Sequence, residues 1–434
     1  MYNLKSFFIF ILLAYKLAPV FSQANKPFPQ CNPITNTYPG GAILPDTSSR
    51  EERNKAVCSF YDAWKSRYIR TAKDNQCYVW VNDIDKEISN SEGQGYGMII
   101  VAFMAGYDPA AQKIYDSLYH YFKEHPADSN KYLMAWEQDA NFNSIKSNGA
   151  ADAASDGDMD IAYSLLLADA QWGSNENINH ASIDYKKEAL AMIAAIKSDE
   201  MNAQTFSVLL SNATKKDSKH NEYFSMRLSD FMPAHFRAFY TCTKDSFWLK
   251  AIDNNYALVD LLQRKFSPKT GLVPDFVRQL DVEPKPAEPN YKETKYDGAY
   301  YNNACRVPWR VATDYILNGN AESKRIAGKI NDWLVKAARL QPLNISPGYR
   351  LNGTPLATQD ELKKFDTMPY LSSFTVSAMV DVQNKGWLNK LWMFMLQYDM
   401  DGLTGTGRRK GFNYYDNTIK LFDMIILSGN YWAP

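Results

Sequence analysis

Residues 154–168 read ASDGDMDIAYSLLLA, an acidic start followed by an apolar run. Because residues 161–168 are almost wholly apolar, we expect a helix that is buried around most of its circumference. Ser155 fits the N-cap of this helix, and Asp158, three residues later, completes the acidic form of a capping box. The stretch therefore predicts a buried helix that carries Asp156 in its first turn.

A second stretch repeats this arrangement earlier in the chain. Residues 91–98 read SEGQGYGM, so that Ser91 and Gln94 fit a capping box and Glu92 lies in the first turn. The helix dipole favours any acidic residue there by about 0.3–1 kcal/mol, which is a purely structural explanation. Each glycine in this helix start costs about 1 kcal/mol relative to alanine, however, and the close approach of a ligand or a neighbouring helix would explain them. The two stretches predict two carboxylates, Glu92 and Asp156, at the mouths of two buried helices.

Helical patterns recur along the whole chain, and continuous alternation of strands and helices is absent. They alternate between apolar and amphipathic segments and cover residues 52–68, 93–106, 110–124, 158–171, 185–196, 233–241, 245–265, 307–317, 322–338, 375–382, 385–398 and 414–428. This pattern suits two concentric rings of helices, an inner barrel and an outer ring in contact with water. No linker divides residues 24–434, which we expect to form a single all-α domain. The longest segment without helical periodicity, residues 267–303, is expected to border the functional site.

The first 23 residues have the features of a secretory signal peptide. Lys5 precedes an apolar segment, residues 7–14, and small residues around Ser22 end it. This segment is too short to cross a membrane, and no later run reaches about 18 apolar residues. We therefore expect a secreted protein, extracellular or periplasmic, without a membrane partner.

Composition argues against several function classes. The chain has 48 basic and 48 acidic residues, and removal of residues 1–23 takes away Lys5 and Lys16, which leaves a slightly negative net charge. A nucleic acid is thus not an expected partner, because binding it needs a surplus of Lys and Arg. Five His and five scattered Cys residues without metal-type spacing argue against a zinc site. The 28 Tyr and 10 Trp residues offer flat faces that suit sugar rings, although most will lie in the core.

These stretches resemble the hallmarks of a known family, glycoside hydrolase family 8. Residues 154–168 and Trp172 match that family's signature without a departure. Residues 91–98 resemble its second hallmark, and residues 306–310, which read RVPWR, resemble its third. The similarity extends from about residue 64 to residue 428. It implies an (α/α)6 barrel and an inverting endo-hydrolase of β-1,4-linked polysaccharides, a reaction that needs carboxylates and water but no cofactor or metal.

The resemblance also implies roles for the two carboxylates. Glu92 is the general acid, and Asp156 binds and distorts the sugar at the point of cleavage. In inverting hydrolysis the acid and the base stand about 6.5–9.5 Å apart, which leaves room for the attacking water. A helix N-terminus favours the charged form of Glu92, whereas a general acid must keep its proton near neutral pH. We therefore expect desolvation under a bound sugar chain, or repulsion from Asp156, to raise the pKa of Glu92.

The chain departs from the family's best-known pattern at the general base. Many members have an Asp three residues before the Arg of the third hallmark, where this chain has Asn303, and an amide cannot accept the proton of water. A second branch, rich in chitosanases, also has Asn there and takes its base from a Glu in the preceding loop. Residues 290–294, NYKET, resemble that loop, so Glu293 is the predicted base. Its rivals in the same acidic segment, which otherwise suits a solvated surface loop, are Glu283, Glu288 and Asp297.

Several further residues are candidates for the cleft. Trp136 resembles a Trp that stacks on a sugar, and a buried core position is its alternative. Arg306 and Tyr301 flank Asn303 and are expected to orient the water or a hydroxyl, although an ion pair within the barrel would also account for the Arg. The remaining candidates for substrate contacts are Asn303, Arg227, Asp230 and Tyr415.

The sequence indicates the substrate class less sharply than the reaction type. The combination of Asn303 and Glu293 favours chitosan, whose partly protonated amino groups would be attracted to an acidic cleft. Cellulose-type or mixed-linkage β-glucan is the alternative, since the same branch contains β-glucanases and neutral glucans need only stacking and hydrogen bonds. A non-catalytic polysaccharide-binding protein is a third hypothesis, but such a protein has no need of a proton donor at Glu92. We expect a monomer whose only partner is its polysaccharide.

Overall fold

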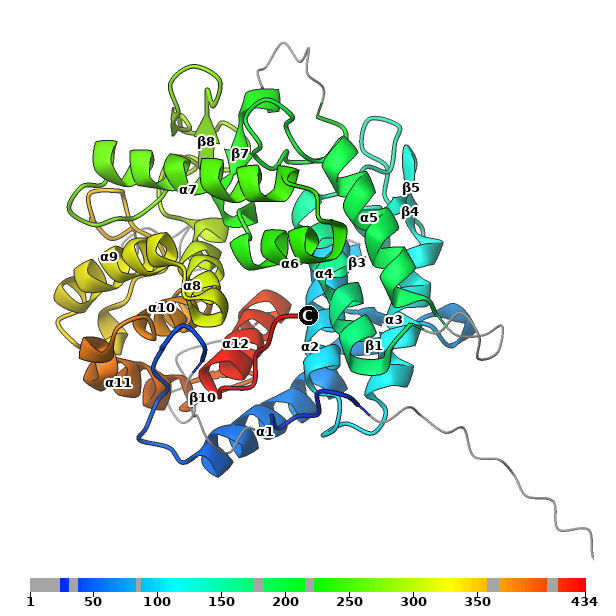
Figure 1. Ribbon diagram of the computed structural model, residues 1–434, viewed down its shortest axis with the longest axis horizontal. Helices are drawn as coiled ribbons and strands as arrows, with labels where there is room; N and C mark the ends of the chain where they lie inside the picture. Colours follow the sequence, from blue (N-terminus) through cyan, green and yellow to red (C-terminus); the bar gives the residue numbers. More distant parts are fainter. Residues whose placement is uncertain are drawn as a thin grey trace, which may run out of the picture.

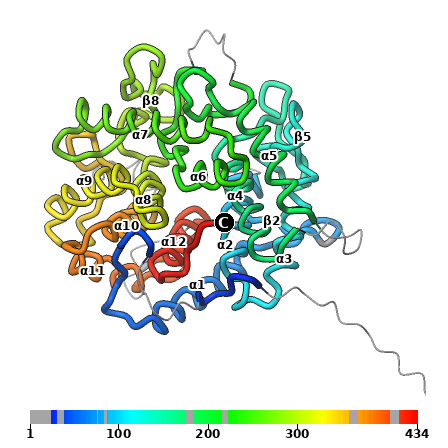
Figure 2. The backbone as a smooth tube through the Cα atoms, viewed as in Figure 1, coloured from blue at the N-terminus to red at the C-terminus, as the bar shows by residue number. Residues whose placement is uncertain are grey.

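The computed structural model describes residues 24–30, 38–82, 87–174, 183–214, 222–356, 367–403 and 413–434, so the predicted signal peptide lies outside it. Within these ranges twelve α-helices form two rings (Figures 1 and 2). The inner helices are α2 (Ser91–Phe103), α4 (Ser155–Trp172), α6 (Pro233–Thr243), α8 (Val307–Asn318), α10 (Met368–Ala378) and α12 (Tyr414–Leu427). The outer helices are α1 (Arg50–Tyr68), α3 (Ala111–Glu124), α5 (Tyr185–Asp199), α7 (Phe247–Lys265), α9 (Ala321–Ala337) and α11 (Lys385–Met395).

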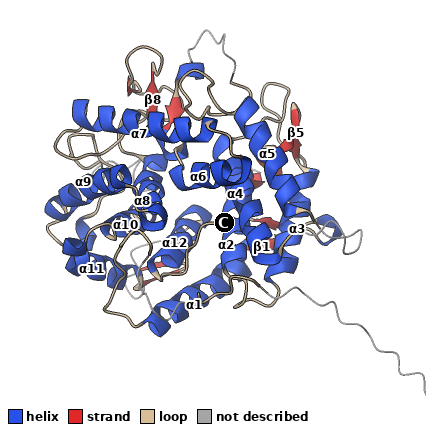
Figure 3. Ribbon diagram, in the orientation of Figure 1, coloured by secondary structure: helices blue, strands red, loops and turns tan. Residues whose placement is uncertain are grey.

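The inner helices close into a barrel. Each packs against the next, from α2 through α4, α6, α8 and α10 to α12, and α12 packs against α2. The outer helices α1, α3, α5, α7, α9 and α11 lie on α12, α2, α4, α6, α8 and α10 respectively. This arrangement is the predicted (α/α)6 barrel. The prediction of an all-α fold is confirmed, because strands form only small sheets of two or three short members (Figure 3).

Burial follows the alternation of apolar and amphipathic segments in the sequence. Every residue of α2 is buried except Glu92, and every residue of α12 is buried except Tyr415. The outer helix α9 instead buries only one face, as its amphipathic sequence predicts. None of the described helices is long and apolar enough to cross a membrane. Glu92 and Tyr415 are thus the positions at which α2 and α12 are partly exposed.

Glycines allow α2 and α4 to approach each other closely. A Cβ atom on Gly95 would lie 2.7 Å from the Cβ of Asp160, and one on Gly157 would lie 2.5 Å from the carbonyl carbon of Ser91. Separations this short are repulsive, so neither position admits a larger residue without displacing the helices. Of the two explanations for the glycines at the start of α2, the neighbouring helix accounts for Gly95.

The predicted capping boxes are wrong by one residue. Asn90, not Ser91, caps α2, and its Oδ1 accepts a hydrogen bond of 2.8 Å from the backbone N–H of Gly93. Gln94 instead accepts from Val79 N at 3.2 Å. At α4 the N-cap is Ala154, which makes no side-chain cap, and Asp158 accepts from Met134 N at 2.8 Å. The polar side chains of these first turns therefore tie the helices to neighbouring segments.

The predicted boundaries of α10 are also wrong. The helix begins at Met368 rather than at residue 375, and it ends at Ala378. Pro369 stands in the first turn, where its missing N–H removes no helical hydrogen bond, and so it starts the helix instead of interrupting it. Val382 belongs to a separate 3-10 turn, Val382–Asn384.

Short strands lie beside the helix ends that carry the site. β3 (Glu87–Asn90) leads into α2 and pairs with β6 (Glu137–Asp139). A three-stranded sheet contains β7 (Met226–Arg227), β8 (Phe276–Arg278) and β9 (Lys285–Pro286). The segment predicted to lack helical structure, residues 267–303, therefore contains two strands and then a loop that returns to the barrel. The other strands are β1 (Ile69–Thr71), β2 (Cys77–Val79), β4 (Pro126–Ala127), β5 (Asn130–Met134), β10 (Tyr398–Asp399) and β11 (Gly402–Leu403).

Candidate active site

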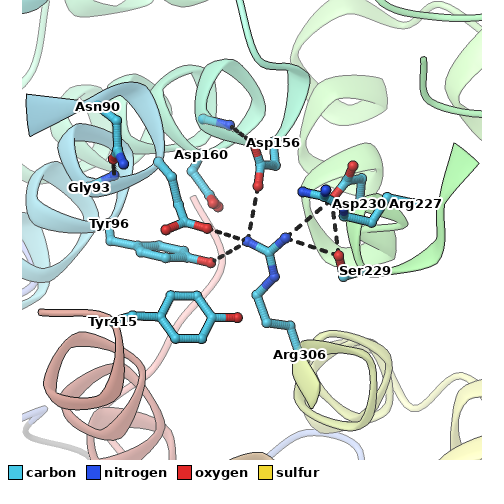
Figure 4. A network of polar contacts seen from close by, with 12 residues as sticks. Asn90, Gly93, Tyr96, Asp156, Asp160, Arg227, Ser229, Asp230, Arg306 and Tyr415 are labelled. Carbon is cyan, nitrogen blue, oxygen red and sulfur yellow. Dashed lines mark hydrogen bonds and ion pairs between the residues drawn. The ribbon is translucent and has the colours of Figure 1, made fainter. Parts of the chain in front are cut away.

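A fully buried arginine joins the two carboxylates predicted to be catalytic. Nη1 of Arg306 lies 2.7 Å from Oε2 of Glu92 and 3.0 Å from Oδ2 of Asp156. Its Nη2 lies 3.0 Å from Oγ of Ser229 and 3.5 Å from Oδ1 of Asp230. Figure 4 shows the guanidinium group of Arg306 between Asp156, Ser229 and Asp230. The first turns of α2 and α4 thus converge on one cation, and the ion-pair interpretation of Arg306 is the one observed.

The ends of four elements position this network. Glu92 and Asp156 occupy the first turns of α2 and α4, where the glycine contact holds the two helices together. Arg306 ends a 3-10 turn, Asn302–Arg306, which leads into α8. Asp230 ends another 3-10 turn, Leu228–Asp230, which follows β7. The network is therefore assembled from segments far apart in the sequence.

A second buried layer lies against the first. Nη2 of Arg310 contacts Oδ2 of Asp160 at 3.1 Å and the hydroxyl of Tyr96 at 3.1 Å. His235 contacts Oδ1 of Asp160 at 2.8 Å, and its ring stacks on Tyr163 with the centroids 3.9 Å apart. All five side chains are buried, so this layer supports the site without reaching the cleft.

Burial and neighbouring charges give the two carboxyl groups opposite pKa shifts. Burial raises the pKa of Glu92; Arg306 opposes this, and Asp156 adds to it. Burial also pushes the pKa of Asp156 upward, but the guanidinium groups of Arg306, Arg227 and Arg310 outweigh it and hold the pKa below its usual value. The rise in the pKa of Glu92 has the predicted direction; its largest cause is burial by the protein itself, and repulsion from Asp156 contributes as expected. A proton donor with a raised pKa beside a carboxylate with a lowered pKa is the combination that glycoside hydrolysis requires.

Asp230 is the third carboxyl group around Arg306. Burial raises its pKa to about 6, the charge of Asp156 adds to this, and the nearby guanidinium groups oppose it. Asp230 is 4% exposed, and its Oδ1 accepts a hydrogen bond of 3.1 Å from Oγ of Ser229. It therefore adjusts the charge of the network and does not line the cavity described below.

Glu293, the predicted base, is held on a loop next to the network. Nη2 of Arg227 forms an ion pair with its Oε1, and Nδ2 of Asn302 lies 3.4 Å from its Oε2. Its backbone N–H donates to Oδ2 of Asp297 at 3.0 Å, and its side chain is 36% exposed. Arg227 in turn interacts with Asp156, which connects the loop to the buried carboxylates. A carboxylate that is open to water and anchored beside Asp156 is suited to activate a water molecule.

The three rivals of Glu293 are engaged elsewhere. Glu283 pairs with Lys265 on α7, and Glu288 pairs with Arg278 and Lys285, which lowers the pKa of Glu288 to about 2. Asp297 is buried and accepts the backbone N–H groups of residues 292, 293 and 294, so it shapes the loop that carries Glu293. These contacts favour Glu293 over its rivals.

A cavity of about 190 Å³ opens beside Glu92. Its lining residues are Glu92, Asn302, Asn303, Pro369, Tyr370, Asn413, Tyr415 and Asp416. Among the predicted cleft residues, Asn303 and Tyr415 therefore reach this cavity. Tyr301 does not line it and packs instead against Tyr296, with the ring centroids 5.0 Å apart. Trp136 is 51% exposed and lies at the entrance to α2, because its carbonyl accepts the N–H of Ser91 at 2.8 Å, so the buried alternative is wrong for this Trp.

The sequence interpretation missed the phenol that contacts Glu92, the predicted general acid. The hydroxyl of Tyr414 donates to Oε1 of Glu92 at 2.5 Å, which fixes the second carboxylate oxygen. The only signal for it was the Tyr414-Tyr415 pair at the start of the last helical pattern. Asn302 and Ser229 were also missed. Among the described residues, no group of three His, Cys, Asp or Glu side chains could hold a metal ion.

Comparisons with known proteins agree with this geometry. Residues 51–387 match the family model described as glycosyl hydrolases family 8. A β-glucanase from Niallia circulans is 38% identical over 97% of this chain and 95% of its own length. An endoglucanase from Bacillus sp. (strain KSM-330) is 35% identical over 94% of this chain and 82% of its own length. The apo structure of a β-1,3-1,4-glucanase from Paenibacillus sp. X4 superposes with a TM-score of 0.83 and 37% identity, covering 94% of this chain and 100% of that one.

The sequence comparisons and the structure lead to one conclusion. The family model matches most of the chain, the relatives are similar over nearly its whole length, and the structure is a helical barrel with the Glu92–Arg306–Asp156 network at its site. The chain belongs to glycoside hydrolase family 8 and is a glycoside hydrolase.

Proposed function

We propose that this protein is a secreted, inverting endo-β-glucanase that cleaves β-1,4 linkages in mixed-linkage or cellulose-type β-glucan. The observation that carries the proposal is the shared contact of Glu92 and Asp156 with Arg306, which sets a carboxyl group with a raised pKa beside one with a lowered pKa. Support for β-glucan comes from relatives named β-glucanase, endoglucanase and β-1,3-1,4-glucanase over nearly the whole chain. These names favour β-glucan, the alternative substrate, over chitosan, the substrate that the sequence motifs favour.

In the proposed mechanism Glu92 donates its proton to the glycosidic oxygen as the bond from this oxygen to C1 breaks. The bonding electrons pass to the leaving oxygen, and C1 develops positive charge. Asp156 stabilises this charge and the distorted ring, because its carboxylate is kept ionised by the surrounding guanidinium groups. Tyr414 and Arg306 hold one oxygen each of Glu92 and so fix the direction of proton transfer.

Glu293 completes the reaction as the general base. Its carboxylate accepts a proton from a water on the face of the sugar opposite Glu92, and the water oxygen forms the new bond to C1. Arg227 and Asn302 contact one oxygen each of Glu293 and orient it. The product acquires the α configuration from a β linkage, and Glu92 regains a proton from the solvent.

Side-by-side hydrolysis of barley β-glucan and chitosan tests the proposal. We expect reducing sugar to be released from β-glucan at least tenfold faster than from chitosan, and Glu92→Gln to abolish this release. Faster release from chitosan would overturn the substrate assignment. Binding of both polymers without hydrolysis would instead identify a polysaccharide-binding protein.

A further inference from the structure

A second groove lies on the outer ring, away from the catalytic residues. It is formed by α7, the loop after α5 and the turn that follows β8, and its volume is about 530 Å³. This volume lies within the range of about 300–1,000 Å³ that is typical of ligand sites. Its lining residues share no member with the cavity beside Glu92. Figure 1 shows α7 in the outer ring.

Five residues that line the groove carry neutral hydrogen-bonding groups. They are the amides of Gln204, Asn254 and Asn255 and the hydroxyls of Thr205 and Ser207. Gln204 and Asn254 are exposed. Asn255 is 1% exposed, and its Nδ2 donates to the carbonyls of Ala251 and Phe206 at 2.7 and 3.0 Å, so this amide holds the loop after α5 against α7.

The loop after α5, which contributes Gln204, Thr205 and Ser207 to the groove, is held in an unfavourable backbone conformation. Phe206 has a φ of 56°, which is rare for a residue with a bulky side chain. Its carbonyl accepts from Nδ2 of Asn255 at 3.0 Å, and its ring packs on Phe247 of α7 with the centroids 5.2 Å apart. Asn202 accepts the backbone N–H groups of Gln204 and Thr205 at 2.8 and 3.0 Å. Strain that the surrounding structure maintains in this way is typical of ligand-binding segments.

The rest of the described lining is apolar, and the groove carries little charge. Leu258 and Leu261 of α7 and Leu280 of the β8 turn are its apolar members, and Asp281 is the only ionisable side chain among the described lining residues. A neutral polysaccharide has hydroxyl edges and C–H faces, which match a lining of amides, hydroxyls and leucines.

The groove is connected to the catalytic loop through the three-stranded sheet. Leu280 follows β8 and donates its N–H to the carbonyl of Phe224, just before β7, which carries Arg227. β9 continues into the loop of Glu293. A chain bound in the groove is thus held by the same sheet that positions the proposed base.

We propose that this groove is a second binding site for a neutral β-glucan chain, separate from the catalytic cleft. The inference rests on the proposed function, since the ligand is the polymer that the enzyme cleaves. A long polymer that occupies both sites binds more tightly than its separate contacts predict, whereas a short oligosaccharide occupies only one.

Two variants test the site without touching the catalytic residues. Gln204→Ala/Asn254→Ala removes the exposed amides, and Ala257→Leu fills the groove from α7 with a good helix former. Gln383→Ala, which removes an exposed amide beside α11, is the matched control. Thermal unfolding of each variant verifies that the fold is intact.

Each substitution is placed in the Glu92→Gln background, and migration in gels containing barley β-glucan is measured. We expect both groove variants to weaken retardation by about fivefold or more in apparent Kd, whereas the control leaves it unchanged. In the active enzyme the KM for β-glucan should rise by a similar factor, and the KM for a short glucan oligosaccharide should not. Unchanged retardation and unchanged KM for the polymer in both groove variants would overturn the proposal. If the active enzyme does not cleave β-glucan but Ala257→Leu still weakens retardation, the proposed function is wrong and the second binding site is supported.

Discussion

The coupling between Glu92 and Asp156 gives a prediction whose magnitude follows from the structure. The two carboxylate oxygens contact the same nitrogen of Arg306 at 2.7 and 3.0 Å, so they lie no more than about 5.7 Å apart. At this separation two negative charges repel by about 3 kcal/mol in a medium with an effective dielectric constant of about 20. Asp156→Asn removes one charge, retains an oxygen that can accept from Arg306, and thereby lowers the pKa of Glu92.

The sign of the effect on activity follows from the role of Glu92. A general acid works only while it is protonated, so activity is lost as the pH rises through its pKa. The alkaline limb of kcat/KM on β-glucan should therefore move to lower pH in Asp156→Asn, in addition to a fall in rate from lost stabilisation of the distorted sugar. Glu288→Gln serves as the control, because it removes the charge of an exposed carboxylate that follows β9 and pairs with Arg278. An alkaline limb that stays in place, or moves to higher pH, would refute the coupling.

Three further predictions follow. Glu293→Gln should reduce kcat on β-glucan by about 10²–10⁴-fold with the melting temperature retained, and near-normal turnover would exclude this residue as the base. Tyr414→Phe removes a hydrogen bond that favours the charged form of Glu92, so the alkaline limb of its pH profile should shift to higher pH, opposite to Asp156→Asn; a shift to lower pH would contradict this role. Gly157→Ala places a Cβ 2.5 Å from the backbone of Ser91 and should lower the free energy of unfolding by about 1–3 kcal/mol in urea titrations. An unchanged urea midpoint would show that α2 and α4 can separate without cost.

The barrel could be predicted because its signal is repeated in the sequence. Each inner helix appears as an apolar run and each outer helix as an amphipathic one, and burial in the folded chain depends on that difference. The start of α2 shows the limit of this reasoning. Asn90 and Ser91 are both good N-cap residues, and the choice between them depends on β3, which holds Asn90 extended through its pairing with β6.

The centre of the site was predictable in part. The positions of Glu92 and Asp156 follow from the helix starts that carry them. The partners of Arg306 do not, because they come from three other segments whose distance in space is set by ring closure and not by local sequence. Tyr414 was missed for the same reason, since α12 meets α2 only when the barrel closes.

The loop of Glu293 shows a different limit. Only the resemblance of residues 290–294 to the family's loop distinguishes Glu293 from its three rivals in the sequence, and in the structure their partners separate them. Glu283 pairs with Lys265, Glu288 with Arg278, and Asp297 with backbone N–H groups, whereas Arg227, the partner of Glu293, also acts on Asp156. The substrate is a similar case: the sequence motifs alone favour chitosan, whereas the names of the relatives favour β-glucan.

The anomeric configuration of the first product tests the proposed mechanism most directly. Proton NMR of barley β-glucan during the first minutes of hydrolysis distinguishes the α from the β anomer at the new reducing end before mutarotation mixes them. A proton donor at Glu92 and a water activated by Glu293 on the opposite face predict the α anomer. Initial formation of the β anomer would contradict the account.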